Sequence, residues 1–229
     1  MLHQRLIGYQ DQSVGLLAEE GFAYSVGGDY YSFIDLPDER LAIAVGDVAG
    51  KAAAAALQGS LAVGTLREHV VSHPCDPAEM LGHMNHRLEQ PRLDNRFVAM
   101  TFGIFDPADR SLVVANGGFT RPLLLRRGKL ERIPARGVPL GLLLGVSYEE
   151  ERVNLQPGDV VAFVSDGLQE AIDGQGQQFG DRFLVDVLEA LASVSAQKIA
   201  EGLIRASTAY AGPEERHPDD RSVVIVKVR

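Results

Sequence analysis

The sequence has a single cysteine, Cys75, and no tryptophan. One cysteine cannot form an intrachain disulfide, which excludes the disulfide-rich secreted folds and suits a reducing compartment. No apolar run approaches the roughly 18 residues that a membrane-spanning helix needs. The start, "MLHQRLIGYQDQ", also lacks the apolar core of a signal peptide. We therefore expect a cytoplasmic protein with no membrane segment.

Positive charge is scarce as well. The chain has 22 Lys and Arg against 31 Asp and Glu, a net charge of -9 at pH 7, and no Lys/Arg-rich face is evident. This balance argues against nucleic acid or an anionic membrane as a partner. The 45% hydrophobic and 23% charged fractions are those of a globular protein, and 229 residues can bury a substantial core. We expect one domain over 1–229, with 1–20 as either a regulatory segment or a linker.

Short apolar runs bounded by turn residues predict nine strands. These runs lie at 22–26, 30–36, 41–48, 97–106, 111–118, 122–127, 129–133, 160–167 and 222–228. Residues 37–39, Pro-Asp-Glu, predict a hairpin turn between two of them. Tight turns at 106–107 and 127–128 make the strands of 97–133 typical of an antiparallel meander.

Helical patterns occupy the remaining long segments, 51–71, 76–90, 181–192 and 195–210. The first is rich in Ala and Leu, and the second begins at Asp76, a favoured capping residue. Strands grouped with strands and helices with helices indicate the α+β class. Two antiparallel sheets, each covered outside by a helix pair, would bury these apolar faces in an αββα sandwich.

Aspartates recur at the ends of predicted core strands, at Asp29, Asp47, Asp166 and the pair Asp219–Asp220. Any one of them is most simply explained as a turn residue whose side chain accepts hydrogen bonds from nearby backbone amides. Several at the edges of adjacent sheets could come together, and clustered carboxylates repel unless cations lie between them. Oxygen ligands suit hard cations, Mg²⁺ or Mn²⁺, rather than zinc. The positions therefore suggest a two-metal site built on strand ends.

Two phosphate-related motifs are set aside. "GGDYY" is similar to the GG(D/E)EF hairpin of certain cyclases, but Tyr30 stands where those enzymes need an acidic residue. "GDVAGK" imitates a P-loop, but its glycines are one residue too close and Ala52 replaces the Ser/Thr that would contact Mg²⁺.

Two histidine pairs have spacings that can hold zinc. His69 and His73 lie four apart on one predicted helix, and His83 and His86 lie three apart on the next. Neither pair has the acidic neighbour of a hydrolytic zinc motif, so we expect them on solvated helix faces.

Seven motifs in order carry a resemblance to a known family. They are "VGGDYYSF", "VGDVAGKA", "NGGFTRPLL", "VPLG", "LQPGDVVAFVSDGLQEA", "FG" at 179–180 and "DDRSVVIVKV". In this order the chain resembles the PPM-type metal-dependent serine/threonine protein phosphatases, specifically the bacterial SpoIIE/RsbU branch. The resemblance runs from about Val26 to the C-terminus and implies an αββα sandwich.

By position, the resemblance implies a binuclear centre of two Mn²⁺ or Mg²⁺ ions. The implied ligands are Asp29, Asp47 as the bridging group, the backbone carbonyl of Val48, Asp166 and Asp219. Asp220 is the alternative to Asp219. A water between the metals, positioned by Asp29 and Asp47, would supply hydroxide for in-line attack on phosphorus. Neither a cysteine nucleophile nor a phosphoenzyme is implied.

The chain departs from the family pattern around phosphate recognition. Ala49 and Ala52 replace the usual residues after the second motif, and Phe119 stands where the family often has His. Eukaryotic relatives hold phosphate with an arginine near the first motif, and no arginine lies close before Asp29 here, which leaves Arg121 as a weak phosphate-binding candidate by exclusion. "NGG" itself reads better as a tight turn.

Two residues outside the ligand set have open roles. His217 is either a leaving-group acid or an ordinary loop histidine. Lys51 either faces solvent at a helix start or helps to hold a phosphate.

The resemblance implies a phosphorylated regulatory protein as substrate, such as an anti-sigma-factor antagonist or a related STAS-type stress-signalling domain. Regulation would come from a partner, from homodimerisation through the N-terminal segment, or from further domains of a longer parent chain. The alternative function is a catalytically weak, phosphatase-like binding module that sequesters a phosphorylated partner, because a fold does not guarantee its chemistry.

Overall fold

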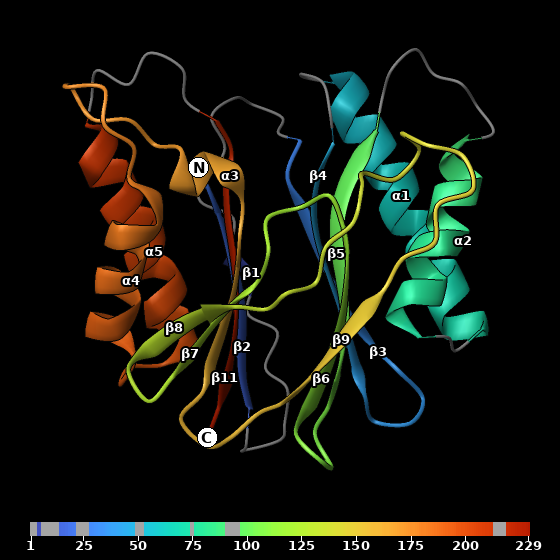
Figure 1. Ribbon diagram of the computed structural model, residues 1–229, viewed down its shortest axis with the longest axis horizontal. Helices are drawn as coiled ribbons and strands as arrows, with labels where there is room; N and C mark the ends of the chain where they lie inside the picture. Colours follow the sequence, from blue (N-terminus) through green and yellow to red (C-terminus); the bar gives the residue numbers. More distant parts are fainter. Residues whose placement is uncertain are drawn as a thin grey trace. The chain divides into compact units, whose positions relative to one another are not determined.

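The computed structural model describes residues 4–5, 14–21, 28–48, 53–73, 76–89, 97–212 and 219–229. The chain forms two compact units, each discontinuous in sequence. The β3–β9 unit comprises Val26–Arg121 and Ile133–Leu155, and the β10–β11 unit comprises Met1–Ser25, Pro122–Arg132 and Gln156–Arg229. Each unit contains one antiparallel sheet with helices against it (Figure 1). A single domain over 1–229 stays a prediction.

The sheet of the β3–β9 unit has the strand order β3-β4-β5-β6-β9. Its strands are β3 Tyr30–Asp35, β4 Leu41–Val48, β5 Val98–Asp106, β6 Ser111–Gly117 and β9 Glu150–Asn154. Its helices are α1 Ala53–Ser72 and α2 Pro77–Glu89.

Helices α1 and α2 lie against the same face of this sheet (Figure 1). Ala62, Leu66 and Val70 recur every four residues on α1 and are fully buried, which is the spacing of one helix face. Met80 and Met84 do the same on α2. These side chains share one core cluster with the strands, so burial of an apolar stripe positions α1 against β3 and β4 and α2 against β5 and β6.

The sheet of the β10–β11 unit has the strand order β1-β2-β11-β10-β7-β8. Its strands are β1 Gln4–Arg5, β2 Val14–Gly21, β7 Leu123–Arg126, β8 Lys129–Arg132, β10 Val160–Val164 and β11 Arg221–Val228. Its helices are α3 Asp166–Gln169, α4 Gly180–Leu191 and α5 Ala196–Ala211.

Helices α4 and α5 pack on this second sheet. Leu184 and Leu188 of α4 join Ile199 and Leu203 of α5 in one buried cluster with residues of β10 and β11. Helix α5 begins at Ser195, whose side chain accepts a hydrogen bond from the backbone N–H three residues later at 3.3 Å, as N-cap residues do. Among the helices in the described ranges, none has both the length and the apolar character that crossing a membrane requires.

Most predicted elements are confirmed to within a few residues. β4 spans Leu41–Val48 as predicted, and the 37–39 turn closes the β3–β4 hairpin. The predicted strand at 22–26 lies outside the described residues.

β2 and β9 have no counterpart among the predicted strands. β2 lies largely in the 1–20 segment and pairs with the whole of β11. β9, "EERVN", is a charged edge strand with little apolar signal.

The predicted meander through 97–133 is wrong. β5 and β6 pair in one sheet, whereas β7 and β8 belong to the other, where β7 pairs with β10. In a meander β7 would pair with β6, but β9 pairs with that edge of β6 instead. The ladder ends after β6 because Gly118 has a φ of 81°, which is not a strand conformation, and Pro122 has no N–H to donate.

Candidate metal centre

Asp29 and Asp47 lie opposite each other at one end of the β3–β4 hairpin. The antiparallel pairing continues past β3, because the backbone N–H of Val48 donates to the carbonyl of Gly28 at 3.2 Å. Asp29 and Asp47 are the next residues inward in the same register. Residues directly opposite in an antiparallel pair have Cβ atoms about 4.5–5.5 Å apart, and like charges there are destabilising. The hairpin therefore brings two predicted ligands together at a cost that a cation between them would remove.

Gly28 lies against the predicted ligand oxygens. A Cβ atom at this position would lie 2.5 Å from Oδ1 of Asp47 and 3.1 Å from the carbonyl oxygen of Val48. Both distances are shorter than ordinary van der Waals contact, so a side chain here would occupy the space in front of these oxygens. Glycine keeps this space available for a ligand of the two oxygens.

The pKa of Tyr30 shows that the negative charges of both aspartates act at this end of the hairpin. Its hydroxyl is buried and, among the described residues, has no hydrogen-bond partner. Burial raises the pKa of Tyr30 well above its usual value, and the negative charges of Asp47 and then Asp29 raise it further. Both carboxylates therefore act on one buried point, and the resulting negative potential favours a cation.

The other two predicted ligands, Asp166 and Asp219, lie in the β10–β11 unit, where the end of β10 meets the start of β11. Ser165 fixes this junction: its backbone N–H donates to the carbonyl of Ser222 at 2.9 Å, and its hydroxyl oxygen accepts from the N–H of Ser222 at 2.9 Å. The same hydroxyl donates to the carbonyl of Asp220 at 3.2 Å. Asp166 follows as the first residue of α3. The junction holds Asp166 next to the strand that Asp219 precedes.

The charges of Asp166 and Asp219 interact. Part of the Asp166 side chain remains exposed, but its partial burial raises the pKa of the carboxyl, and the negative charge of Asp219 raises it further. A hydrogen bond from the N–H of Gly167 at 2.9 Å opposes this rise. A Cβ atom at Gly167 would lie only 2.2 Å from the carbonyl oxygen of Asp220 and 3.0 Å from Cβ of Asp219. A glycine again allows the close approach.

The two alternatives at the last motif differ in their surroundings. Asp219 is exposed, its Oδ1 accepts the N–H of Asp220 at 2.9 Å, and its charge reaches Asp166. The side chain of Asp220 is 7% exposed. These observations favour Asp219 over Asp220 as the ligand.

The donor atoms fit a hard divalent cation. Each unit supplies a carboxylate pair at a sheet end, and the β3–β9 unit adds a backbone carbonyl, so all donors are oxygens. Within the described residues, no single group of three or more His, Cys, Asp or Glu side chains could hold a metal ion. That both pairs share one binuclear centre stays a prediction.

The "NGG" segment is not the tight turn expected from the sequence, because Asn116 and Gly117 are the last two residues of β6 and the chain bends only at Gly118. The side-chain amide of Asn116 donates to the carbonyl of Phe119 at 3.0 Å and to Oγ1 of Thr101 at 3.1 Å, and Gly118 has a positive φ. Arg121 follows this bend and is half-buried. Its phosphate-binding role stays a prediction.

Four further residues discussed from the sequence lie outside the described ranges: Ala49, Lys51, Ala52 and His217.

The prediction of solvated histidine faces is wrong for His69 and His83. These side chains are half-buried and come from α1 and α2, and their rings stack with centroids 3.7 Å apart. Burial lowers the pKa of His83, and the His69 ring lowers it further. Sequence spacing within each helix does not reveal a pair formed between helices.

Arg221 is a residue of the site region that the sequence did not point out. The residue is 7% exposed, and its guanidinium donates from Nε to the carbonyl of Gly167 and from Nη1 to Oγ1 of Thr208, each at 3.3 Å. It thereby ties the Asp166 turn to α5. The signal in the sequence is a charged residue at the start of an otherwise apolar strand, directly after Asp219–Asp220.

Replacing Arg221 with leucine should lower the melting temperature of the metal-free protein. The carbonyl of Gly167 would lose a buried donor, and such a loss costs about 1–3 kcal/mol, or about 2–4 °C per kcal/mol in a chain of this size. Thermal unfolding followed by circular dichroism measures the change. Arg205→Leu is the matched control, because its side chain is 78% exposed. Equal melting temperatures for the two variants would contradict a structural role for Arg221.

Comparison with known proteins identifies the family. The family model described as "Stage II sporulation protein E (SpoIIE)" matches residues 37–229. This match covers the β4, β10 and β11 motifs.

A curated relative and two solved structures agree with this match. The phosphoserine phosphatase RsbU of Bacillus subtilis is 26% identical over 177 residues, 74% of this chain and 51% of RsbU. The PP2C phosphatase domain of SpoIIE from Bacillus subtilis, solved with a fragment of its regulatory domain, has a TM-score of 0.82 at 22% identity, over 94% of this chain and 63% of that one. RsbX, solved in complex with magnesium, has a TM-score of 0.72 at 14% identity over the full length of both chains.

These matches establish the fold and the family of the chain, although the chain covers only part of each curated relative. The chain spans between 24% and 51% of the length of the curated relatives that it matches. The structural likeness confirms the predicted α+β fold with two antiparallel sheets and helix pairs. The chain belongs to the SpoIIE family, in the SpoIIE/RsbU branch of the PPM-type (PP2C) serine/threonine protein phosphatases.

Proposed function

We propose that this protein is a cytoplasmic, divalent-metal-dependent phosphatase that removes phosphate from phosphoserine or phosphothreonine on a regulatory protein. The observation that carries the proposal is the pair of like-charged residues Asp29 and Asp47, opposite each other in the hairpin register, with Gly28 against Oδ1 of Asp47 and the carbonyl of Val48. Like charges directly opposite each other are destabilising, and a cation bound between them would remove this repulsion.

Two Mn²⁺ or Mg²⁺ ions are the proposed cofactors. Asp29, Asp47 and the carbonyl of Val48 would bind from one unit, and Asp166 and Asp219 from the other. When bound, the ions would lower the pKa of a water and offset charge on the phosphoryl oxygens. The magnesium complex of RsbX supports this choice of ion class.

The chain's own groups have defined tasks in this proposal. Asp29 and Asp47 would orient the attacking water relative to phosphorus and hold its proton away from the phosphoryl oxygens. Tyr30, packed beside them, excludes bulk water from one side, since its ring is buried with Val48 in the same core cluster. A site with less water gives stronger electrostatic interactions at the developing negative charge.

The proposed substrate is a phosphorylated regulatory protein, such as an anti-sigma-factor antagonist or a STAS-type stress-signalling domain. The named activity of RsbU, a phosphoserine phosphatase, supports phosphoserine as the group attacked. The predicted metal ligands lie in different units, Asp29 and Asp47 in one and Asp166 and Asp219 in the other, so the substrate phosphate would contact residues far apart in the sequence.

Hydrolysis of a phosphoserine peptide tests the proposal directly. We expect turnover with Mn²⁺ or Mg²⁺ and activity at the level of the blank with chelator, because the attacking water depends on the ions. Phosphate release measures this, and activity recovered by adding Mn²⁺ in excess of chelator controls for damage. Turnover indifferent to chelator would overturn the metal-dependent mechanism. Tight phosphopeptide binding without turnover would favour the binding module instead.

A further inference from the structure

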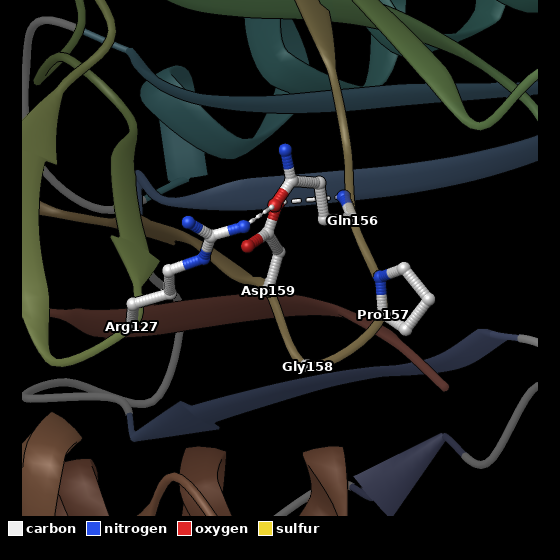
Figure 2. A pocket seen from close by; sticks show the side chains of 5 residues that line it. All are labelled: Arg127, Gln156, Pro157, Gly158 and Asp159. Atoms are coloured by element: carbon white, nitrogen blue, oxygen red, sulfur yellow. Dashed lines mark hydrogen bonds between the residues drawn. The ribbon is translucent and has the colours of Figure 1, made fainter.

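A pocket of about 510 Å³ opens on the β10–β11 unit, away from the metal ligands predicted in that unit. It is lined by Arg127 of the β7–β8 turn and by residues 156–159, which lead into β10. Figure 2 shows the Arg127 side chain directed toward Gln156, with Asp159 beside them, and the guanidinium Nη2 donates to Oε1 of Gln156 at 3.0 Å. A cavity of this size is within the range of ligand pockets, about 300–1,000 Å³.

The lining of the pocket contains one arginine, Arg127, and one carboxylate, Asp159. Asp159 is buried, and its charge is already compensated by Arg126, which donates from Nη2 to Oδ2 at 2.6 Å. The N–H of Gln156 donates to the same oxygen at 2.7 Å (Figure 2). Arg127, in contrast, is exposed and bonds a neutral oxygen; within the described ranges no carboxylate forms a salt bridge with it. An oriented guanidinium without an anionic partner is suited to bind one.

The backbone at Arg127 is in a conformation that disfavours arginine. Arg126 pairs with Lys129, so Arg127 and Gly128 form a two-residue hairpin loop. Both have a positive φ, 51° and 73°, and such loops prefer Asn-Gly. Arginine is therefore not a residue that the turn itself favours.

The pocket lies at the opposite end of β10 from Asp166. Asp159 precedes Val160, the first residue of β10, whereas Asp166 follows its last residue, Val164. At about 3.3 Å per residue, the strand separates the two by roughly 20 Å. A ligand that reached both would have the dimensions of a small protein rather than of a single side chain.

We propose that this pocket binds an acidic segment of a partner protein, with a carboxylate of the partner paired to the guanidinium of Arg127. The chain as a whole is acidic, with a net charge of -9, so an acidic partner would be attracted to a guanidinium that has no carboxylate partner among the described residues rather than to the surrounding surface. The proposal rests on the proposed function only in naming that partner as the phosphoprotein substrate. Docking at the pocket would then hold the substrate while its phosphoserine reaches the metal centre.

Peptide binding to the metal-free protein tests the pocket without requiring turnover. The probes are fluorescein-labelled hexaglutamate and hexaglutamine peptides, followed by fluorescence anisotropy at low and at physiological ionic strength. We expect hexaglutamate to bind the wild type, to weaken with salt, and to bind Arg127→Asn at least about tenfold more weakly, because the variant loses a charge-assisted hydrogen bond. Asparagine suits the hairpin loop, so this variant keeps the fold.

Arg110→Asn is the matched control. Arg110 is also exposed with a positive φ of 56°, at the β5–β6 turn of the other unit, and its replacement changes the net charge equally. We expect it to bind hexaglutamate as the wild type does. Equal binding by all three proteins, or hexaglutamine binding as tightly as hexaglutamate, would overturn the proposal.

Two further measurements distinguish peptide docking from small-anion binding and from a role of Arg127 in catalysis. Inorganic phosphate should compete weakly with hexaglutamate; competition at equal concentration would identify a small-anion site instead and overturn peptide docking. Hydrolysis of p-nitrophenyl phosphate should be unchanged in Arg127→Asn. A loss there would place Arg127 in the active site and would equally contradict a remote docking role.

Discussion

Replacing Asp166 with asparagine is expected to abolish phosphatase activity while making the metal-free protein more stable. Asp166 is proposed to bind a metal, and loss of a direct ligand should exceed the 10–100-fold loss typical of groups that only support ligands. We therefore expect turnover to fall by more than about a hundredfold. Without metal, the same carboxylate is partly buried beside Asp219, and the neutral amide relieves both penalties.

The raised pKa of Asp166 determines how the stability of the metal-free protein changes with pH. The pKa of Asp166 is raised in the folded state, so the folded protein holds this proton more tightly than the unfolded chain does. As the pH falls from above the raised pKa toward the ordinary pKa of an aspartate, the folded protein takes up this proton before the unfolded chain does. The free energy of unfolding of the metal-free protein therefore increases over this pH range. Asparagine cannot titrate, so the stability advantage of Asp166→Asn should be largest at neutral pH and should shrink on acidification.

Thermal unfolding with chelator across this pH range, together with peptide hydrolysis in Mn²⁺, measures both effects. Asp186→Asn is the control, because Asp186 lies on α4 of the same unit, outside the predicted ligand set. It should change neither activity nor the pH dependence. An Asp166→Asn protein that is inactive but less stable than the wild type at neutral pH would indicate a structural carboxylate rather than a strained metal ligand.

The local parts of the candidate site follow from the sequence because short-range rules determine them. The alternation of "YYSFIDL" and "LAIAVGDV" around a Pro-Asp-Glu turn specifies a hairpin, and a hairpin specifies which residues face each other. Once the register is set, Asp29 must lie opposite Asp47. The apolar strand before Asp166 likewise places that carboxylate at a strand end without reference to the rest of the chain.

Long-range choices were not predictable in the same way. Whether β6 accepts β7 or β9 as its neighbour depends on which strand can bury its face, and "EERVN" carries almost no apolar signal. The His69–His83 stack and the contacts of Arg221 depend on how elements far apart in the chain pack together. A pattern with a period of two or 3.6 residues has no information about such pairs.

Replacing Gly28 with alanine is expected to remove metal binding while leaving the fold intact. The new Cβ would lie 2.5 Å from Oδ1 of Asp47, which can rotate away, and 3.1 Å from the carbonyl of Val48, which as backbone moves only slightly. The melting temperature with chelator should therefore stay close to that of the wild type, whereas the rise on adding Mn²⁺ should disappear, since a ligand stabilises only the state that it binds.

Gly64→Ala in α1 is the control for this substitution, because a Cβ there meets nothing within 4 Å. It should keep the full Mn²⁺ effect on the melting temperature. An undiminished Mn²⁺ effect in Gly28→Ala would mean that any bound ion does not contact Oδ1 of Asp47 or the carbonyl of Val48. The opposed carboxylates at the hairpin end would then not be metal ligands, and the proposed mechanism would lose the half of its centre that orients the attacking water.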